Sequence, residues 1–445
     1  CLVGSEMCIR DSPYGVHCPI CLTNLHLSFG KGKKVPESLL EIFAQNPEYS
    51  AKLDSLINAK DKVPFKIFDK KNAEKLFGKN LNISASQLEK FNLCRFSYFC
   101  NYGLNVRERQ RAEINPMQYG TIVHYILERF FGEYTKEEYL SLEEDKFQKI
   151  VCAYLAEYAV KYFGEEQLES NSFTYRLKTI LDNVMYLMKH IMEELSQSEF
   201  FVADCELKIG EDIPSYTIVL PDGHKIAVCG SVDRVDIMPR ADITYLRIID
   251  YKTGTKQFKL SDILYGINLQ MLLYLHSIEA SGCDKYGEIV PAGILYMPAT
   301  VPYISSDSLK SIDKLPDELN KKLKMNGLLL KDTEIIHGMD KTDAATYIPV
   351  KIKAGEPVSS TSLATLAEFG KIFKKVDMLI AEMGKNIYSG NIEAKPLKGG
   401  HDSCEYCPYD SVCAYRQSNP ITCFSVDNKT VIEEITNEIN GKEEE

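Results

Sequence analysis

Two acidic residues and a lysine, at the ends of two neighbouring β-like segments, are the side chains of this sequence best placed for chemistry. The first segment, IAVCGSVDRVDI, carries Asp233 and Asp236, and the second, YLRIIDYK, ends in Asp250 and Lys252. Because side chains alternate between the two faces of a strand, Asp250 and Lys252 continue an apolar face. A charged pair in such a place is costly to bury unless it has a use.

Metal-dependent phosphodiester cleavage is a reaction that requires this arrangement. Two carboxylates about 4 Å apart repel by roughly 4 kcal/mol at an effective dielectric constant near 20. A divalent cation removes that penalty, and Mg²⁺ typically binds one or two carboxylates together with phosphate oxygens of its substrate. The metal polarises the phosphate and lowers the pKa of a bound water, while Lys252 orients that water or stabilises developing charge. An ordinary hairpin with a solvated Asp250–Lys252 pair is the alternative.

Two helical patterns add polar residues to this candidate site. His124 lies off the apolar stripe of a helix that we expect to open at Gly120. Gln270 and Tyr274 are one helical turn apart and therefore share a face of a second helix. Taken alone, His124 is better explained as a surface or capping histidine. The alternative for the second pair is a core role for Tyr274 and an exposed Gln270.

The order of these motifs carries a resemblance to a known family. GTIVHYILERF, GSVDRVD, IIDYKTG and QMLLY resemble the four motifs of the RecB-like branch of the PD-(D/E)XK nuclease superfamily. The resemblance implies an α/β fold: a restriction-endonuclease-like core, with a mixed central sheet flanked by helices, and helical elaborations. It also implies a magnesium site and the groups around it, namely His124, Asp233 and Asp250 as ligands, with Asp233, Asp250, Lys252, Gln270 and Tyr274 as catalytic residues.

Two other acids are weaker candidates. Asp236 is less favoured than Asp233, because the first Asp of this motif is the usual metal ligand of the resembling family. Glu206 falls in a preceding strand pattern, where it is equally well explained as an acid on the strand surface. We therefore leave Glu206 out of the predicted site.

A cysteine pattern near the end of the chain forms a second candidate site. Cys404, Cys407 and Cys413 offer three thiolates on one loop, and both iron–sulfur clusters and zinc ions are commonly held by four cysteines. Cys94, in an aromatic-rich helix pattern, is our candidate for the fourth ligand, with Cys100 and Cys423 as rivals. The arrangement resembles the [4Fe–4S] staple of AddB subunits and related nucleases, which ties the ends of the nuclease domain together. Structural zinc and unligated thiols are the alternatives.

Residues 64–416 resemble the nuclease region of the AddB subunits of AddAB helicase–nucleases, above all in KLFGKNLNISASQLEKFNLCRFSYFCNYGL. The resemblance implies an exonuclease or endonuclease that acts on a single strand of unwound DNA in double-strand break repair by homologous recombination. It implies an AddA-like helicase–nuclease partner in a heterodimer. The sequence contains no G-x₄-G-K-[ST] phosphate loop and no helicase-like region, so we expect a fragment without ATPase activity.

Two other functions remain open at this point. A nuclease like the CRISPR-associated RecB-like enzymes or the eukaryotic replication nuclease would share the chemistry but not the assembly. A non-catalytic iron–sulfur scaffold that binds DNA would keep the fold without the reaction. The intact D-x-K pattern and the Gln270–Tyr274 pair favour an enzyme.

Composition excludes several classes of protein. Of the 445 residues, 44% are apolar and 26% are charged, as in soluble globular proteins. The net charge of −11 argues against a protein that coats nucleic acid, but not against a nuclease whose acidic site binds metal. No apolar run is long enough to span a membrane, and no signal peptide is recognisable. Fourteen cysteines without dense spacing indicate a reducing compartment, and thus the cytoplasm.

We divide the chain into four parts. Residues 1–12 look like translated sequencing-adapter DNA and are excluded from the fold. Residues 13–80 are a lysine-rich helical remnant or linker, with a solvated face favoured over contact with a DNA backbone. Cys18-Pro-Ile-Cys21 resembles half of a zinc knuckle, but only His17 and His26 lie nearby, so we do not expect a metal site there. Residues 81–424 form the nuclease domain, and residues 425–445 an acidic tail, which we expect to be a frayed helix.

Hydrophobic periodicity and turn residues give the expected elements. Helices are predicted over 82–103, from 120, and over 137–163, 173–195, 261–279 and 362–383. Strands are predicted over 200–210, 215–220, 224–237, 245–252 and 288–299. The segment 300–360 has no regular period and is predicted to be an elaboration on the core.

Overall fold

The computed structural model describes residues 40–41, 44–45, 50, 66–67, 69–107, 116–164, 170–254, 257–302, 315–342, 344–359, 361–410, 412–413 and 420–443. The predictions for residues 1–12 and for Cys18-Pro-Ile-Cys21 lie outside these residues. The chain forms two compact units, and two of the boundaries between them fall inside helices α6 (Ala85–Leu93) and α17 (Leu366–Tyr388). The larger unit comprises residues 80–89, 109–384 and 425–445, and the smaller one residues 1–79, 90–108 and 385–424.

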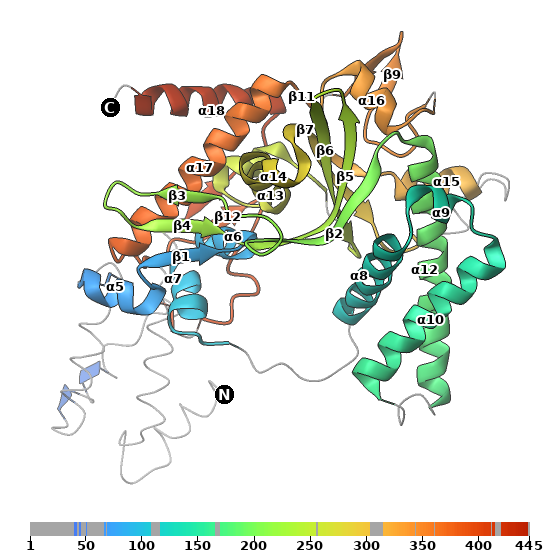
Figure 1. Ribbon diagram of the computed structural model, residues 1–445. Coiled ribbons are helices and arrows are strands. Elements are labelled where there is room, and N and C mark those ends of the chain that lie inside the picture. Colours follow the sequence, from blue (N-terminus) through green and yellow to red (C-terminus); the bar gives the residue numbers. More distant parts are fainter. Residues whose placement is uncertain are drawn as a thin grey trace. The chain divides into compact units, whose positions relative to one another are not determined.

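A mixed sheet of six strands is the centre of the larger unit (Figure 1). Its order is β11-β8-β7-β6-β5-β2, in which β2, β5 and β6 are antiparallel neighbours and β6 pairs with β7 in parallel. The strands are β2 (Phe201–Ile209), β5 (Gly230–Arg240), β6 (Ile243–Lys252), β7 (Glu288–Pro298), β8 (Asn326–Leu330) and β11 (Leu363–Ala364). The predicted mixed central sheet is therefore confirmed.

The central strands are buried on both faces because their sequences are apolar almost throughout. β6 and β7 contain the runs LRII and AGILYM, and most of their residues are inaccessible to solvent. β8, with the sequence NGLLL, pairs antiparallel with β7. The segment 300–360 thus supplies a strand of the core, so its description as a mere elaboration is wrong. A five-residue apolar run is too short for periodicity to reveal.

The strand predicted over 224–237 is two strands in different sheets. β4 (Lys225–Val228) lies between β1 (Asn80–Ile83) and β3 (Thr217–Val219) in a small second sheet, and β5 begins at Gly230. A Cβ atom at Gly230 would collide with the hydroxyl group of Tyr274, so only glycine allows the chain to pass here. The change of sheet at this glycine could not be read from the alternation of side chains.

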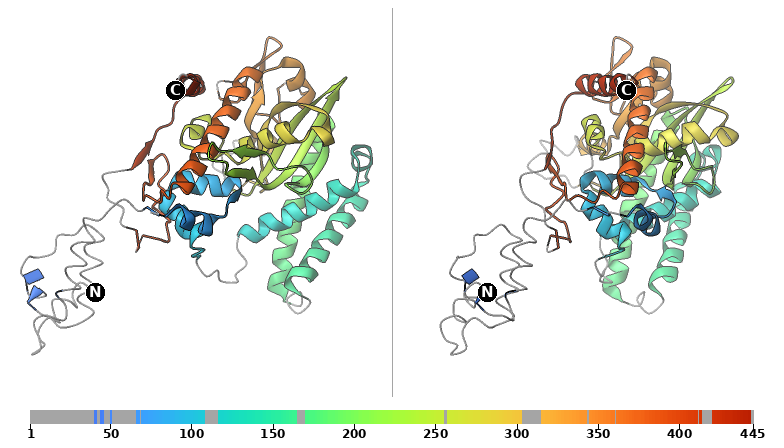
Figure 2. Two further views of the ribbon diagram at one scale, coloured as in Figure 1. Left: turned by 60° about the vertical axis from the view of Figure 1, so that its left-hand side comes forward. Right: turned by 90° about the vertical axis from the view of Figure 1, so that its left-hand side faces the viewer.

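Helices cover both faces of the six-stranded sheet. Figure 1 shows α8 (Pro116–Glu133), α10 (Glu144–Phe163) and α12 (Asn171–Gln197) grouped beside β2, and α13 (Gln270–Ser281) against β6 and β7. Both views of Figure 2 show α10 and α12 side by side. The apolar stripe predicted for α8 is fully buried, which confirms that side as its core face; it comprises Ile122, Val123, Ile126, Leu127, Phe130 and Phe131.

Several helix boundaries differ from the predictions. α8 begins at Pro116, one turn before Gly120, because proline is favoured in the first turn of a helix. The helix predicted over 261–279 is a 3₁₀-helix (Leu260–Tyr265) followed by α13. Gly266, with a φ of 69°, ends the first of them in the left-handed conformation that glycine favours.

The acidic tail is an ordered helix and not a frayed one. α18 (Asn428–Glu443) buries Val431 and Ile435 completely. Glu438 of this helix accepts a hydrogen bond of 2.6 Å from Lys375 of α17. The remaining short elements of the larger unit are α9 (Lys136–Leu140), α14 (Cys283–Tyr286), α15 (Leu315–Leu323), α16 (Thr333–Met339), β9 (Lys351–Lys353) and β10 (Glu356–Val358).

The smaller unit is built on aromatic packing. α5 (Lys70–Phe77), the end of α6, α7 (Arg95–Tyr98) and the π-helical turn Phe99–Gly103 bring Phe77 and Phe91 against the ring of Tyr98. β12 (Leu397–Gly399) and β13 (Ile421–Cys423) form a parallel pair. The helix predicted over 82–103 begins only at Ala85, because Asn82 and Ile83 belong to β1. The predicted capping pair is confirmed, since Ser84 and Gln87 bond reciprocally. It is interrupted at Cys94, whose backbone is extended.

Candidate active site

The predicted acid pair is brought together by the β5–β6 hairpin. Arg234 pairs with Ile249 in the antiparallel ladder, so Asp233 and Asp250 follow as the next residues facing each other. The backbone N–H of Tyr251 donates a 2.9 Å hydrogen bond to Oδ2 of Asp233. The side chains of Asp233 and Asp250 are 12% and 3% exposed. Two carboxylates thus share a nearly dry site.

This proximity changes the acidity of the pair. Burial raises the pKa of Asp233 to about 7, and the charge of Asp250 raises it further toward that value. His124 and the N–H of Tyr251 act in the opposite direction but do not outweigh burial. Near neutral pH, therefore, the ionised form of Asp233 is disfavoured unless a cation is close by.

His124 and Glu206 complete a group of candidate metal ligands around Asp233. Nδ1 of His124 lies 3.0 Å from Oε1 of Glu206 and 3.7 Å from Oδ2 of Asp233. One donor atom from each of these three residues lies within 4.8 Å of the others. Burial lowers the pKa of His124, but Glu206 and Asp233 outweigh it, so the net pKa is raised. The site is therefore rich in negative charge and in atoms that bind divalent cations.

Glu206 is the site residue that sequence reasoning left out. It lies on β2 opposite Asp233, and its carboxylate also accepts a 2.8 Å hydrogen bond from the hydroxyl of Ser231. Its φ of 51° is a left-handed conformation, uncommon for a residue other than glycine and costly within a strand. The register of β2 against β5 also shifts between Val202 and Asp204. An alternating pattern in the sequence reveals neither feature.

Asp250 is held between Gln270 and Lys252. Its Oδ1 accepts a 3.0 Å hydrogen bond from the side-chain amide of Gln270. Nζ of Lys252 lies 2.5 Å from Oδ2, which has no other polar partner within the described part of the chain. A carboxylate oxygen with one cationic neighbour retains a lone pair with which it can bind a metal ion. The predicted neighbours Asp250, Lys252 and Gln270 therefore meet.

The first turn of α13 sets the position of Gln270. The carboxylate of Glu89, on α6, accepts a 2.7 Å hydrogen bond from the backbone N–H of Leu269, and the N–H of Gln270 lies 3.4 Å from the same oxygen. An acid there also complements the helix dipole. Glu89 was not recognised from the sequence, because it lies 180 residues away from the helix that it caps.

Tyr274 lies one turn further along α13 and does not reach Asp250 directly. Its ring packs against Gly230, its hydroxyl interacts with the backbone of Ala85, and burial raises its pKa to about 12. The charge of Asp233 also acts on this hydroxyl. Tyr274 therefore packs behind the beginning of β5, which carries Asp233 three residues later.

The predicted cysteine ligands gather in the smaller unit. Cys94 and Cys100 are buried together with Tyr409, and Cys407 and Cys413 pack against this cluster. The charges of Cys407 and Cys404 act on the thiol of Cys94, which places these sulfurs near one another. The hydroxyl of Tyr409 donates a 2.6 Å hydrogen bond to the carbonyl of Val106. The structure thus packs Cys94, Cys407 and Cys413 together with Cys100, and Cys404 is close enough for its charge to act on Cys94.

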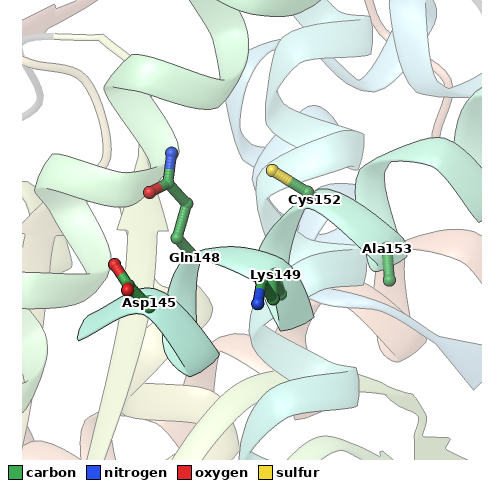
Figure 3. A pocket seen from close by; sticks show the side chains of 5 residues that line it. All are labelled: Asp145, Gln148, Lys149, Cys152 and Ala153. Carbon is green, nitrogen blue, oxygen red and sulfur yellow. The ribbon is translucent and has the colours of Figure 1, made fainter. Parts of the chain in front are cut away.

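A surface hollow of about 560 Å³ lies apart from both groups (Figure 3). Its lining residues all belong to α10 and are Asp145, Gln148, Lys149, Cys152 and Ala153. Among the described residues, no helix is long and apolar enough to cross a lipid bilayer.

Comparison with known proteins identifies a family over the region that contains these motifs. The model of a family described as the PD-(D/E)XK nuclease superfamily matches residues 82–414. The chain is similar to proteins named as the B subunits of ATP-dependent helicase/deoxyribonucleases. It is 32% identical to that of Clostridium kluyveri (strain NBRC 12016), over 95% of this chain and 38% of that protein. It is 34% identical to that of Thermoanaerobacter sp. (strain X514), over 77% of this chain and 30% of that protein. The chain thus spans about a third of the length of these relatives.

Proposed function

Because this chain belongs to the PD-(D/E)XK nuclease superfamily, we propose that its acidic centre cleaves DNA with a bound divalent metal ion. The observation that carries the proposal is the buried pair Asp233 and Asp250, whose negative charge is only partly offset by Lys252. Such a pair is costly in a folded protein without a cation, and PD-(D/E)XK nucleases use one.

The residues present fit Mg²⁺. Oxygen atoms of Asp233 and Asp250, with Glu206 and Nδ1 of His124 beside them, would hold the ion. The close approach of His124, Glu206 and Asp233 supports this fit. When bound, the ion supplies Lewis-acid activation of the phosphodiester and lowers the pKa of a water. Glu206 enters the proposal as an additional ligand or as the group that orients His124.

The other side chains would act on the substrate and on the carboxylates. Lys252, whose side chain is 27% exposed, can reach both Asp250 and a phosphate, so it would orient the attacking water and stabilise charge that develops on phosphate oxygens. Gln270 fixes the carboxylate plane of Asp250 through its hydrogen bond. Tyr274 would support the strand that carries Asp233.

We also propose that Cys94, Cys404, Cys407 and Cys413 hold a [4Fe–4S] cluster. The burial of Cys94 and its packing with Cys407, Cys413 and Tyr409 support the fit, because thiolates gathered in an apolar cluster need a cationic partner. The cluster would serve a structural purpose, because it would join the segment around Cys94 to the loop that carries the other three cysteines. Zinc is the alternative occupant of the same thiols.

The assembly is proposed from the names of the relatives. We propose that residues 81–424 are the nuclease domain of a B-type subunit, which works with an AddA-like helicase–nuclease subunit on a single strand of unwound DNA. Double-strand break repair by homologous recombination would be the setting. The match to long regions of proteins named as B subunits favours this assembly over the CRISPR-associated and replication nucleases.

The nuclease proposal is tested by Asp250→Ala. The variant should lose Mg²⁺-dependent cleavage of linear single-stranded DNA by about a thousandfold, because several kcal/mol of charge stabilisation disappear. Calorimetric titration of Mg²⁺ without DNA should show weaker binding. The control is Asp242→Ala, which removes an exposed acid from the turn of the same hairpin. Cleavage by wild-type protein must stop in EDTA; full activity of Asp250→Ala would contradict the assignment.

The cluster proposal is tested by anaerobic purification and an absorption spectrum. Wild-type protein should contain iron and sulfide and show the broad visible absorption of thiolate-ligated iron. Cys407→Ser should lose the iron, whereas Cys283→Ser, at an exposed cysteine outside the group, should keep it. If the wild-type protein contained stoichiometric zinc and no sulfide, the iron–sulfur proposal would be wrong and zinc would be the occupant of these thiols.

A further inference from the structure

A second group of charges lies on the other side of the strands that carry the acid pair. Arg234 and Asp236 of β5, Arg247 of β6 and Glu194 of α12 are all 0% exposed, and we call these four residues the buried charge cluster. Because strand side chains alternate, their face of the sheet is opposite to that of Asp233 and Asp250. The proposed hydrolysis does not use any of them.

The cluster is balanced in charge, and among the described residues Nη1 of Arg247 is its one nitrogen without a hydrogen-bond partner. Arg234 donates two hydrogen bonds of 2.7 Å to Asp236 and one of 3.0 Å to Glu194. Arg247 donates a 3.0 Å bond to Asp236 and a 2.6 Å bond to Glu194. Burial raises the pKa of Asp236, but the two arginines outweigh it and keep the pKa below its usual range. Two cations and two anions are therefore locked together without water.

These bonds fix the register of the two catalytic strands. Asp236 faces Arg247 in the same ladder in which Asp233 faces Asp250, three residue pairs further along. A slip of one residue would turn every side chain of a strand to the opposite face. Glu194 bonds both arginines, so α12 holds β5 and β6 at one alignment.

Tyr251 connects this cluster to the acid site. Its hydroxyl lies 3.4 Å from Nη1 of Arg234, which donates to it. Its backbone N–H bonds Asp233, and its ring meets that of His124 edge to face at 5.8 Å. A single residue thus contacts both the cluster and two candidate metal ligands.

We propose that the buried charge cluster, acting through Tyr251, positions Asp233 and His124 for metal binding, so that its residues are positioning residues of the nuclease. The inference rests on the proposed function, because it assumes that these two residues hold the ion. A purely structural role would affect only the stability of the fold, whereas a positioning role also affects the affinity for Mg²⁺. Buried ion pairs replaced by apolar residues of similar size often leave stability unchanged or increased, so stability and positioning can be separated.

The test is the double variant Glu194→Leu/Arg247→Met, which removes one anion and one cation and leaves Arg234 bonded to Asp236. We expect a melting temperature close to that of the wild type, but a Mg²⁺ affinity, measured by calorimetry without DNA, that is about 10- to 100-fold weaker. At saturating Mg²⁺, kcat on single-stranded DNA should fall while KM for DNA stays unchanged. The matched control is Glu144→Leu/Lys189→Met, an exposed ion pair between α10 and α12, which should change neither quantity.

Tyr251→Phe is the second variant, and it decides the matter if the double variant does not fold. It keeps the ring contact with His124 and the backbone bond to Asp233, and removes only the hydroxyl that Arg234 contacts. Weaker Mg²⁺ binding supports the proposal. A folded variant with wild-type Mg²⁺ affinity and kcat overturns it. Wild-type protein that neither binds Mg²⁺ nor cleaves DNA would instead refute the proposed function itself.

Discussion

The two faces of the β5–β6 hairpin carry the same kinds of charged residue in opposite states. On one face, the carboxylates of Asp233, Asp250 and Glu206 outnumber the cationic groups of Lys252 and His124. On the other face, Arg234 and Arg247 match Asp236 and Glu194. Burial alone therefore does not distinguish a candidate functional acid from a structural one. The better indication is a buried negative charge that neighbouring cations balance only in part.

The same substitution on the two faces should therefore have opposite effects on stability. Asp236→Asn leaves two buried arginines against one full anion and should lower the free energy of unfolding by about 3–5 kcal/mol. Asp233→Asn, measured at pH 8 in EDTA, removes a repelled carboxylate and should raise it by about 1 kcal/mol or more. Urea unfolding at one pH compares the two variants. Equal destabilisation by both would remove the distinction between the faces.

The pH dependence of stability should differ in the same way. The folded pKa of Asp233, about 7, lies above the unfolded value, so between about pH 4 and pH 7 the native state holds a proton that the unfolded state has lost. Stability of the metal-free protein should consequently fall with rising pH, by at most about 1.4 kcal/mol per unit. The raised pKa of His124 adds a loss of the same sign above about pH 6.5.

Asp233→Asn should flatten this dependence in EDTA, and saturating Mg²⁺ should flatten it for the wild type. Thermal unfolding across the pH range measures both. A slope that survives in the variant would show that the titrating group is elsewhere. Asp236 cannot produce this slope, because its pKa is lowered and its carboxylate stays ionised.

A smaller pH-dependent loss of stability is expected from a third charged group, around His276 of α13. Burial lowers its pKa, but Asp377 and Glu279 outweigh burial and raise it to about 9. The stability it contributes is complete below about pH 6.5 and is lost as pH rises through 9. We expect a loss of about 1 kcal/mol, less than the shift alone would give, because Asp377 is 34% exposed and screened by solvent. Asp377→Asn should abolish this loss in urea unfolding at pH 8 and pH 10.

The acidic β5–β6 hairpin could be predicted from the sequence because it depends only on local patterns. Alternation places Asp250 and Lys252 on one face, and the turn to β6 is short, so the partner acid of β5 follows from antiparallel pairing. Gln270 was expected one turn from Tyr274 and does contact Asp250. These relations need only strand and helix periods, together with the order of the motifs.

The missed features depend on contacts between distant segments. Glu194 looks like any polar residue of a long helix until α12 is packed against the arginines of the sheet. Glu206 contacts His124 from a left-handed backbone conformation, which a glutamate in a strand pattern does not predict. Cys94 was expected inside a continuous helix, but the chain is extended there, where its sulfur joins a cluster formed with the last loop. In each of these three places, tertiary packing determines the conformation or the contacts of the residue, and the local sequence pattern does not.

The cap that Glu89 provides for α13 has a practical consequence for protein expression. A recombinant piece cut just ahead of His124, at the first nuclease motif, would lose this carboxylate and the strand β1. The backbone donors of Leu269 and Gln270 would then face no acceptor, and the edge of β4 would be open to intermolecular pairing. The shortest useful expression boundary therefore lies upstream of Asn80, well ahead of the first nuclease motif.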